Sequence, residues 1–348
     1  MRLHSPLSFA AITAFLIGCS NLPTSPLSPE RAALSKPSFA AGNGPVGGEL
    51  MIQSGFDGSE IVTGANNKAD DLVGADLSLA KPNDWVLDFE NRADIGKVQI
   101  YYESGLPSQR IAKIWVDPLN QNNKILKFLL FDTNVMDPEY SSGKGRVQMD
   151  VYGNSDLYEV YQSVRVLLPT STYSLVKNYA SAIDWLTLME FWNDGPWEAG
   201  CENTVFRISV NLEKPSATPG SSLYLSVHGQ TNNPGDGKFV KGKYVWDERS
   251  TVAMPIGQWF TLETYFKEGG TGEGRFYMAM TSSQNVKTVL FDIRNTTLHP
   301  KKTNPDGLKA FNPLKLYTGS GILAWMKQNG KALDIFYDDF RLWKNARP

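Results

Sequence analysis

The sequence predicts an all-β protein, a sandwich of two stacked antiparallel sheets. From about Met51 the apolar residues recur with a period of two, and clusters of Gly, Asn, Asp and Pro bound each run. About fifteen such runs follow one another with a single helical segment between them, which excludes a parallel α/β sheet. No repeat of 20–50 residues is present, so a propeller or solenoid is not expected. We expect one domain over residues 49–348.

Composition excludes several other classes. The chain has 348 residues, of which 41% are hydrophobic and 20% charged, as in ordinary globular proteins. Its 34 Lys and Arg residues are balanced by 36 Asp and Glu residues, whereas binding to nucleic acid needs a basic surface. We expect no nucleic acid partner. The three His and two Cys residues lack the close spacing of a zinc site.

The N-terminal segment has the pattern of a secretion signal followed by a tether. The apolar run 9–17 has the length of a signal-peptide core and is too short to cross a bilayer. It ends in Leu16-Ile17-Gly18-Cys19, which resembles the lipobox of bacterial lipoproteins. The resemblance implies cleavage of residues 1–18, a lipid on Cys19 and anchoring in the bacterial cell envelope. Ser20 after the cysteine favours the outer membrane, and an ordinary signal peptide is the alternative. Residues 19–48, rich in Pro, Ser and Ala, are expected to form a flexible tether.

The body of the chain follows as strands. We predict them at 85–90, 97–103, 111–116, 125–132, 146–152, 158–168, 185–193, 205–213, 223–228, 259–266, 275–281, 288–293, 314–317, 322–326 and 332–343. Residues 172–183 are predicted to be helical. Asn329-Gly330 predicts a type I′ hairpin turn between the last two strands, because both central positions of that turn need a positive φ.

Alternation assigns one face of each strand to the core. In 146–152 the inward residues are Val147, Met149 and Val151, and Arg146 begins the outward set. The same pattern turns further polar and aromatic residues outward, namely Gln148, Asp150, Glu190, Trp192, Arg207, Asn211, Tyr224, His228, Tyr277, Lys315 and Tyr317. Aromatic rings stack on the apolar faces of sugars and polar groups bind the hydroxyls, so this face favours a polysaccharide partner. The alternative is an ordinary solvent-facing sheet.

Several strand patterns extend this hypothesis to a family. Residues 145–149, 161–169, 185–192, 257–263 and 337–343 resemble, in sequence and order, strands of the concanavalin-like jelly-roll polysaccharide lyases that act on alginate, glucuronan and heparin. The resemblance implies a jelly-roll sandwich with one concave sheet that binds substrate. In these lyases an Arg-x-Glu strand and a Gln-x-His strand face the polymer. Arg146 matches the arginine and Gln148 replaces the glutamate. Glu190 and Trp192 occupy the Gln-x-His positions.

The lyase hypothesis assigns roles to side chains. Elimination from a uronic acid polymer needs a group that neutralises the carboxylate, a base for the C5 proton and an acid for the leaving oxygen. Arg146 or Arg207 is expected to neutralise, His228 to be the base, and Tyr224 or Tyr277 to be the acid. Together the catalytic candidates are His228, Arg146, Glu190, Tyr224 and Tyr277. The substrate-binding candidates are Trp192, Arg207, Asn211, Gln148, Lys315 and Tyr317.

Two alternatives remain open at this stage. A glycan-binding lipoprotein without catalysis needs only the stacking and hydrogen-bonding side chains. A glycoside hydrolase needs two carboxyl groups about 5–9.5 Å apart, which Glu190 and either Asp150 or Asp194 are candidates to supply.

No cofactor is required by any of the three hypotheses. The pair Asp338 and Asp339 is a candidate site for a structural Ca²⁺, which binds carboxylate and carbonyl oxygens, and a pair of solvated acids is the alternative.

Overall fold

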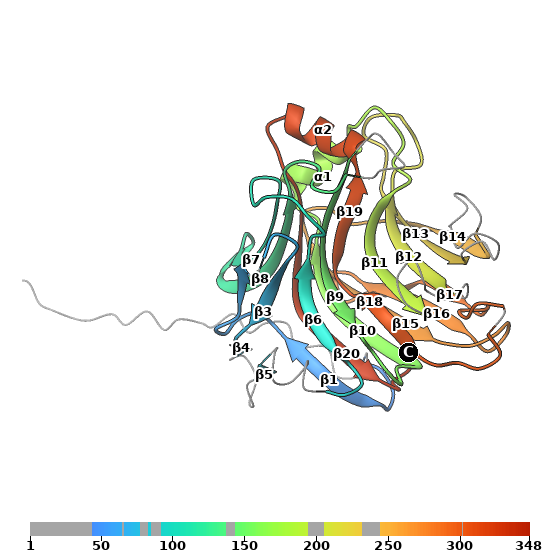
Figure 1. Cartoon of the computed structure of the whole chain (residues 1–348). Coiled ribbons are helices and arrows are strands. Elements are labelled where there is room, and N and C mark those ends of the chain that lie inside the picture. The colour runs from blue at the N-terminus through green and yellow to red at the C-terminus, as the bar shows by residue number, and fades with distance from the viewer. Residues whose placement is uncertain are drawn as a thin grey trace, which may run out of the picture. The chain divides into compact units, whose positions relative to one another are not determined.

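The computed structural model describes residues 44–64, 66–76, 83–84, 92–136, 143–193, 205–231, 244–300 and 302–348. Most of the regular structure in these ranges is β-strand, accompanied by two short helices (Figure 1). The paired strands are antiparallel and form two large sheets, which confirms the predicted all-β sandwich. The predicted signal peptide, Cys19 and most of the tether lie outside the described residues, as does the predicted strand 85–90.

One sheet has eight strands. They are β1 (Glu49–Ser54), β7 (Arg110–Asp117), β8 (Asn120–Leu130), β10 (Glu159–Leu167), β15 (Trp259–Lys267), β16 (Arg275–Thr281), β17 (Lys287–Ile293) and β20 (Leu333–Lys344). Their order is β17-β16-β15-β10-β20-β8-β7, and β1 also pairs with β20. The final strand of the chain therefore lies in the middle of this sheet.

The other sheet has ten strands. They are β2 (Ile61–Gly64), β3 (Ala69–Val73), β6 (Lys97–Tyr101), β9 (Lys144–Tyr152), β11 (Leu186–Asn193), β12 (Phe206–Glu213), β13 (Tyr224–Thr231), β14 (Trp246–Ala253), β18 (Leu308–Asn312) and β19 (Lys315–Gly319). Their order is β14-β13-β12-β11-β18-β9-β6-β3-β2. β19 also pairs with both β11 and β9, so β18 and β19 share the position between those two strands. A separate short ladder joins β4 (Ala75–Asp76) to β5 (Asn83–Asp84).

The core lies between the two sheets and follows the predicted alternation. Val147, Met149 and Val151 of β9 are completely buried in it. Phe191 of β11 crosses the interface, since its ring stacks on Phe266 of β15 with the ring centroids 5.8 Å apart. Such interdigitation of inward side chains is what holds two stacked sheets together. It leaves the opposite face of the ten-stranded sheet to the polar residues described below.

The sequence-based assignment missed several strands. β1, β2, β3, β14 and β18 were not predicted. In β14, whose sequence is Trp-Asp-Glu-Arg-Ser-Thr-Val-Ala, most side chains are exposed, so the strand has no apolar alternation to reveal it. β14 is an edge strand, and edge strands depend on backbone pairing more than on burial.

The predicted strand 322–326 is wrong, because these residues lie in helix α2 (Ser320–Gln328). Ile322, Leu323 and Met326 are its buried residues, which is helical spacing that we interpreted as a short apolar run. The predicted hairpin turn at Asn329-Gly330 is wrong for the same reason. Gly330 has a φ of 66°, and its N–H donates to the Lys327 carbonyl. The N–H of Lys331 donates to the Met326 carbonyl. This is the Schellman arrangement that ends a helix.

The other helix is shorter than predicted. α1 (Thr170–Lys177) begins directly after Pro169 and is followed by its C-cap residue Asn178, whereas the prediction extended to Ile183. Ile183 instead exchanges two backbone hydrogen bonds of 2.9 Å with Lys214, next to β12. Among the described residues, no helix is long and apolar enough to span a membrane.

Candidate functional site

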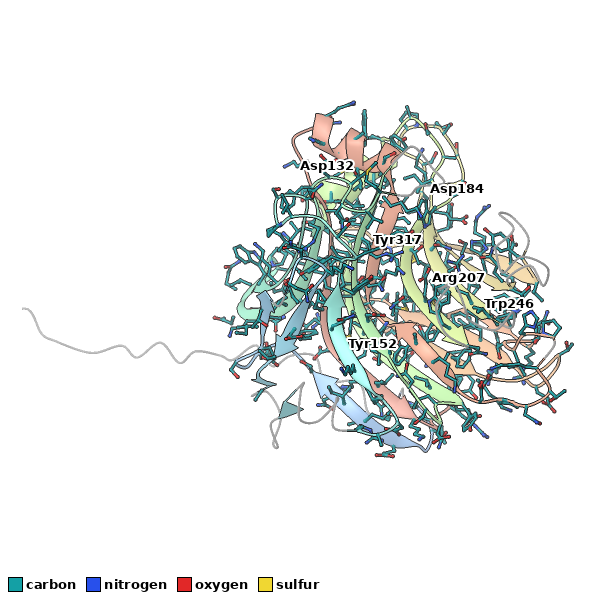
Figure 2. All side chains as sticks on the ribbon, in the orientation of Figure 1. Asp132, Tyr152, Asp184, Arg207, Trp246 and Tyr317 are labelled. Atoms are coloured by element: carbon teal, nitrogen blue, oxygen red, sulfur yellow. The ribbon has the colours of Figure 1, made fainter. Side chains whose placement is uncertain are left out.

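The outward face of the ten-stranded sheet brings together most of the predicted site residues. The side chains of Arg146 and Gln148 leave β9 on the side opposite the core, and Lys315 and Tyr317 are their cross-strand neighbours on β19. β11 and β12 add Glu190, Trp192, Arg207 and Asn211 to the same face. Figure 2 shows Tyr317 on β19 and Arg207 on β12, and β11 lies between these two strands.

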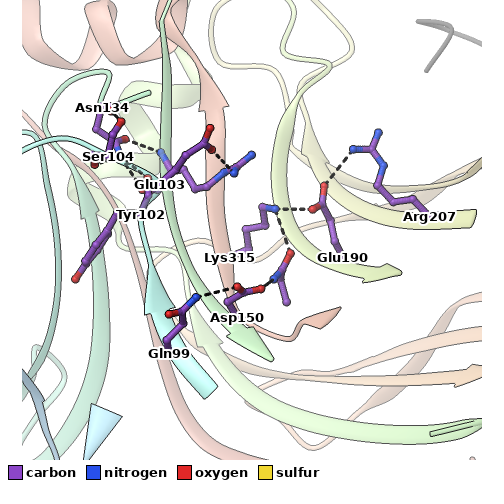
Figure 3. Close-up of polar contacts among 11 residues, drawn as sticks. Gln99, Tyr102, Glu103, Ser104, Asn134, Asp150, Glu190, Arg207 and Lys315 are labelled. Atoms are coloured by element: carbon purple, nitrogen blue, oxygen red, sulfur yellow. Dashed lines mark hydrogen bonds and ion pairs between the residues drawn. The ribbon is translucent and has the colours of Figure 1, made fainter. Parts of the chain in front are cut away.

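A buried ion pair occupies the centre of this face. The ammonium group of Lys315 lies 2.5 Å from Glu190 Oε2, and both side chains are at least 96% buried. The guanidinium group of Arg207 lies 3.5 Å from the other oxygen of Glu190. Figure 3 shows the resulting row, in which Glu190 lies between its two cations. Charges this deeply buried persist only when they are paired, so the three residues depend on one another.

Burial shifts the pKa values of this pair. It lowers the pKa of Lys315 to about 8, with the negative charge of Glu190 opposing the shift. Burial alone raises the pKa of Glu190, but the charges of Lys315 and Arg207 outweigh it and the net shift is downward. Glu190 therefore remains ionised, while Lys315 loses its proton at about pH 8, well below the usual range of a lysine.

Arg146 and Tyr317 form the next contact along the face. The guanidinium carbon of Arg146 lies 4.4 Å from the centroid of the Tyr317 ring, and Arg146 also pairs with Glu103. The ring of Trp185 meets Tyr317 edge-on with the centroids 4.8 Å apart. Lys315 Nζ lies 4.9 Å from the same Tyr317 centroid. The phenol ring of Tyr317 thus lies between Arg146 and Lys315.

Three further polar residues hold Lys315 in place. Asn312 Oδ1 lies 3.3 Å from Lys315 Nζ and its amide donates to Asp150 at 2.8 Å. Gln99 donates to the other oxygen of Asp150 at 3.2 Å. Burial raises the pKa of Asp150, with these hydrogen bonds opposing the shift. Gln99 and Asn312 were missed, because β18 was not predicted and neither residue stands out in its own strand.

Trp192 and Arg207 extend the site on the other side of Glu190. The guanidinium carbon of Arg207 lies 5.4 Å from the Trp192 ring centroid, and its Nη2 donates to Gln230 at 2.6 Å. Asn211 accepts a hydrogen bond from Thr187 at 2.7 Å. These side chains place an aromatic surface beside hydrogen-bonding groups, which is the combination expected for a sugar.

His228 lies in a second, separate cluster. Across the sheet Glu190 is opposite Ser209 and Ser209 is opposite His228, a separation of two strand spacings, or about 10 Å. His228 Nε2 lies 3.2 Å from Ser226 Oγ and 3.6 Å from Glu213. Its ring stacks on Tyr244 with the centroids 4.3 Å apart. The sequence therefore predicted the correct face for His228 but not its distance from Glu190.

The two tyrosines predicted as acids take different places. Tyr224 belongs to β13 and lies two residues from Ser226, beyond the His228 cluster. Tyr277 belongs to β16 in the eight-stranded sheet, where it packs with Tyr161 and Tyr265. It therefore does not share a face with His228, contrary to our expectation. Alternation identifies the face of a strand, but it does not identify the sheet to which the strand belongs.

The residues of the predicted calcium site do not fit a metal. Asp338 lies in the eight-stranded sheet and is paired with Arg165 at 2.9 Å and with Asn123 at 2.9 Å. Asp339 lies 3.2 Å from the same guanidinium. Arg165 thus supplies the positive charge that a calcium ion was expected to supply. Within the described ranges no group of three or more His, Cys, Asp or Glu side chains could hold a metal ion.

A cavity of about 310 Å³ lies elsewhere, among residues of β2, β3, β6–β7 and their loops. Its polar groups are paired with one another. Tyr102 donates to Asp70 at 2.5 Å, and the guanidinium of Arg110 covers the Tyr102 ring at 3.6 Å. None of the predicted site residues lines it.

Solved structures with a similar fold include enzymes and a lectin. Alginate lyase Aly36B is 15% identical, with a TM-score of 0.43, over 84% of this chain and 98% of that chain. Endo-β-1,4-glucuronan lyase from the fungus Trichoderma reesei is 14% identical, with a TM-score of 0.39, over 68% and 88%. The exoplasmic/lumenal domain of VIP36 with Ca²⁺ and mannose is 10% identical, with a TM-score of 0.35, over 68% and 82%. No family model and no curated protein sequence matches the chain.

Two antiparallel sheets with a polar and aromatic outer face define the class of this protein. It has the concanavalin-like jelly-roll fold that the strand patterns predicted. At 10–15% identity the similarity concerns the fold alone. The chemistry of this chain must therefore be argued from its own site residues.

Proposed function

We propose that the chain is a polysaccharide lyase that binds a uronic acid-containing glycan on the outward face of the ten-stranded sheet and cleaves it by β-elimination. The observation that carries this proposal is the position of Lys315. It is a buried lysine with a pKa of about 8, and it contacts both Glu190 and Tyr317. A general base works best when its pKa lies near the working pH, which burial achieves here.

The charges and positions of the four side chains suggest the part that each would play in the elimination. Arg146 and Arg207 flank the centre and would pair with the uronate carboxylate, which stabilises the negative charge that develops on loss of the C5 proton. Neutral Lys315 would take that proton. As the C4–O bond breaks and a C4=C5 double bond forms, Tyr317 would give its phenolic proton to the leaving oxygen. Lys315 then loses its proton to solvent and Tyr317 regains one.

This assignment replaces His228 as the base. His228 lies two strands from Glu190 and contacts Ser226 and Glu213 in its own cluster. In the proposal it belongs to a neighbouring part of the glycan surface. Because Tyr277 lies on the other sheet, Tyr317 replaces it as the acid.

One observation favours a second function, glycan binding without turnover. At 2.5 Å the Lys315 ammonium is tightly paired with Glu190, and a lysine that keeps its proton cannot act as a base. The same side chains would then bind the polymer only. The two functions differ in whether product forms.

Measurement of unsaturated product separates them. Purified protein is incubated with uronate-containing and neutral polysaccharides, and ultraviolet absorbance of the new double bond is followed. We expect product from a uronate polymer only, with kcat/KM rising up to tenfold per pH unit until about pH 8 as Lys315 loses its proton. Lys315→Gln and Tyr317→Phe should each lower kcat by 10²-fold or more, on the order expected for a lost acid or base.

Two controls complete this test. Lys331→Gln removes an exposed lysine and should leave kcat unchanged. His228→Ala should retain most of kcat. Loss of activity in His228→Ala with full activity in Lys315→Gln contradicts the proposed roles, and binding without product on every polymer supports the second function.

For the N-terminal segment we propose that Cys19 is lipidated after removal of residues 1–18 and that residues 19–48 tether the domain to the outer membrane. The proposal rests on Leu16-Ile17-Gly18-Cys19 and on Ser20. In a bacterial host, radiolabelled palmitate should label the full chain but not Cys19→Ser, and the labelled protein should fractionate with outer membranes. Equal labelling of both proteins contradicts the proposal.

A further inference from the structure

Two buried polar atoms on β9 lack hydrogen-bond partners among the described residues. They are Nε of Arg146 and Oε1 of Gln148. The side chain of Arg146 is otherwise engaged with Glu103 and Tyr317. Gln148 is only 5% exposed, and its Oε1 accepts no hydrogen bond within the described ranges. A buried acceptor without a partner destabilises the fold, so the presence of Gln148 at this position calls for an explanation.

The positions of Arg146 and Gln148 in the sheet supply an explanation. Arg146 and Gln148 lie two residues apart on the same strand and so on the same face. Across the ladder Arg146 is opposite Tyr317 and Gln148 is opposite Lys315. An unpaired donor and an unpaired acceptor therefore lie directly beside the proposed acid and base.

The two atoms together select for one chemical group. Arg146 Nε–H can only donate and Gln148 Oε1 can only accept. A hydroxyl group accepts from the first and donates to the second at the same time. A sulfate ester presents only acceptor oxygens to Gln148, and an acetyl ester has no O–H to donate.

We propose that Arg146 and Gln148 bind a free hydroxyl group of the sugar next to Lys315, so that the site takes unsubstituted uronans and rejects polymers carrying O-sulfate or O-acetyl groups at that position. The inference rests on the proposed function, because it needs a uronan on this face. It adds a specificity that the fold does not define.

The test compares one polymer in two forms, an unsubstituted uronan and the same uronan after chemical O-acetylation. Dissociation constants and kcat/KM are measured for both forms. The wild-type protein should prefer the unsubstituted form by about 10- to 100-fold, the range for leaving one buried acceptor unpaired. Gln148→Met removes both polar atoms of the amide and should reduce the preference to about threefold or less.

Two further variants sharpen the test. Gln148→Glu keeps an acceptor and should keep the preference, whereas Gln121→Met, at an exposed position of β8, should change nothing. The melting temperature of Gln148→Met should equal or exceed that of the wild type, because an unpaired buried acceptor is removed. A lower melting temperature with an unchanged preference would falsify the inference and assign Gln148 a structural role.

The outcomes also separate this inference from the proposed function. A binding preference that persists without any turnover contradicts the lyase proposal alone. Turnover of both forms at equal rates contradicts the hydroxyl specificity alone. Absence of binding to every uronan contradicts both.

Discussion

At the scale of single residues, burial determines which ionisable groups can change charge near neutral pH. Lys315 is one such group, and Glu268 is another that the proposed site does not use. Glu268 follows β15, is 3% exposed and accepts the Gly307 N–H at 2.6 Å. Burial raises its pKa to about 7 and the negative charge of Asp306 adds to the shift, while backbone hydrogen bonds from Gly307 and Asp306 and the charge of Lys302 oppose it.

This shift predicts a pH dependence of stability. The folded-state pKa of Glu268 lies above its unfolded value, so the folded protein binds more protons between about pH 4.5 and 7. Its contribution to the free energy of unfolding is complete below about pH 4.5 and is lost as the pH rises through 7. Glu268→Gln, which cannot ionise, should be more stable than the wild type by about 2–3 kcal/mol at pH 8 and nearly equal at pH 4.5.

Urea unfolding at both pH values measures the difference. The exposed Glu248→Gln serves as the control and should change the free energy of unfolding by less than about 0.5 kcal/mol at either pH. If Glu268→Gln gives the same difference at pH 4.5 and 8, the carboxyl group does not titrate in this range.

At the scale of elements, the sequence predicted those strands along which apolar and polar residues alternate. β9, β12 and β16 were predicted within two residues of their ends, because apolar and polar residues alternate along their sequences. β14 could not be found in this way, because its pairing with β13 leaves most side chains in solvent. In α2 the apolar residues at 322, 323 and 326 fit a short strand as well as a helix. Length alone could have distinguished them.

In the site, too, local alternation predicts which face a side chain occupies, whereas contacts between strands depend on how the strands pair. The alternation of β9 correctly placed Arg146 and Gln148 on the outward face. That Lys315 lies against Glu190, 125 residues away, depends on β19 pairing with β11, and no local pattern encodes which strands pair. The prediction of His228 as the base was made without this pairing, because the sequence indicates the face of a strand but not its neighbours in the sheet.

At the scale of the whole molecule, Phe191 joins the core to the site. Its ring stacks on Phe311 of the same sheet, 6.3 Å between centroids, and on Phe266 of the opposite sheet. Its chain neighbours are Glu190 and Trp192, whose side chains point to the outward face. The position of the proposed site thus depends on packing between the two sheets.

We predict that Phe191→Ala lowers the free energy of unfolding by about 3–5 kcal/mol, the usual result of deleting a buried aromatic ring from a close-packed core. Because β11 would shift, the Lys315–Glu190 pair should also be disturbed, and binding of a uronan should weaken along with stability. Trp115→Ala, at a half-exposed position of the edge strand β7, removes an aromatic ring of larger size and should cost less than about 1 kcal/mol. Urea unfolding of both variants gives the comparison. Equal losses in the two variants would mean that the stacked rings contribute no more than surface contacts, and that the two sheets are held together elsewhere.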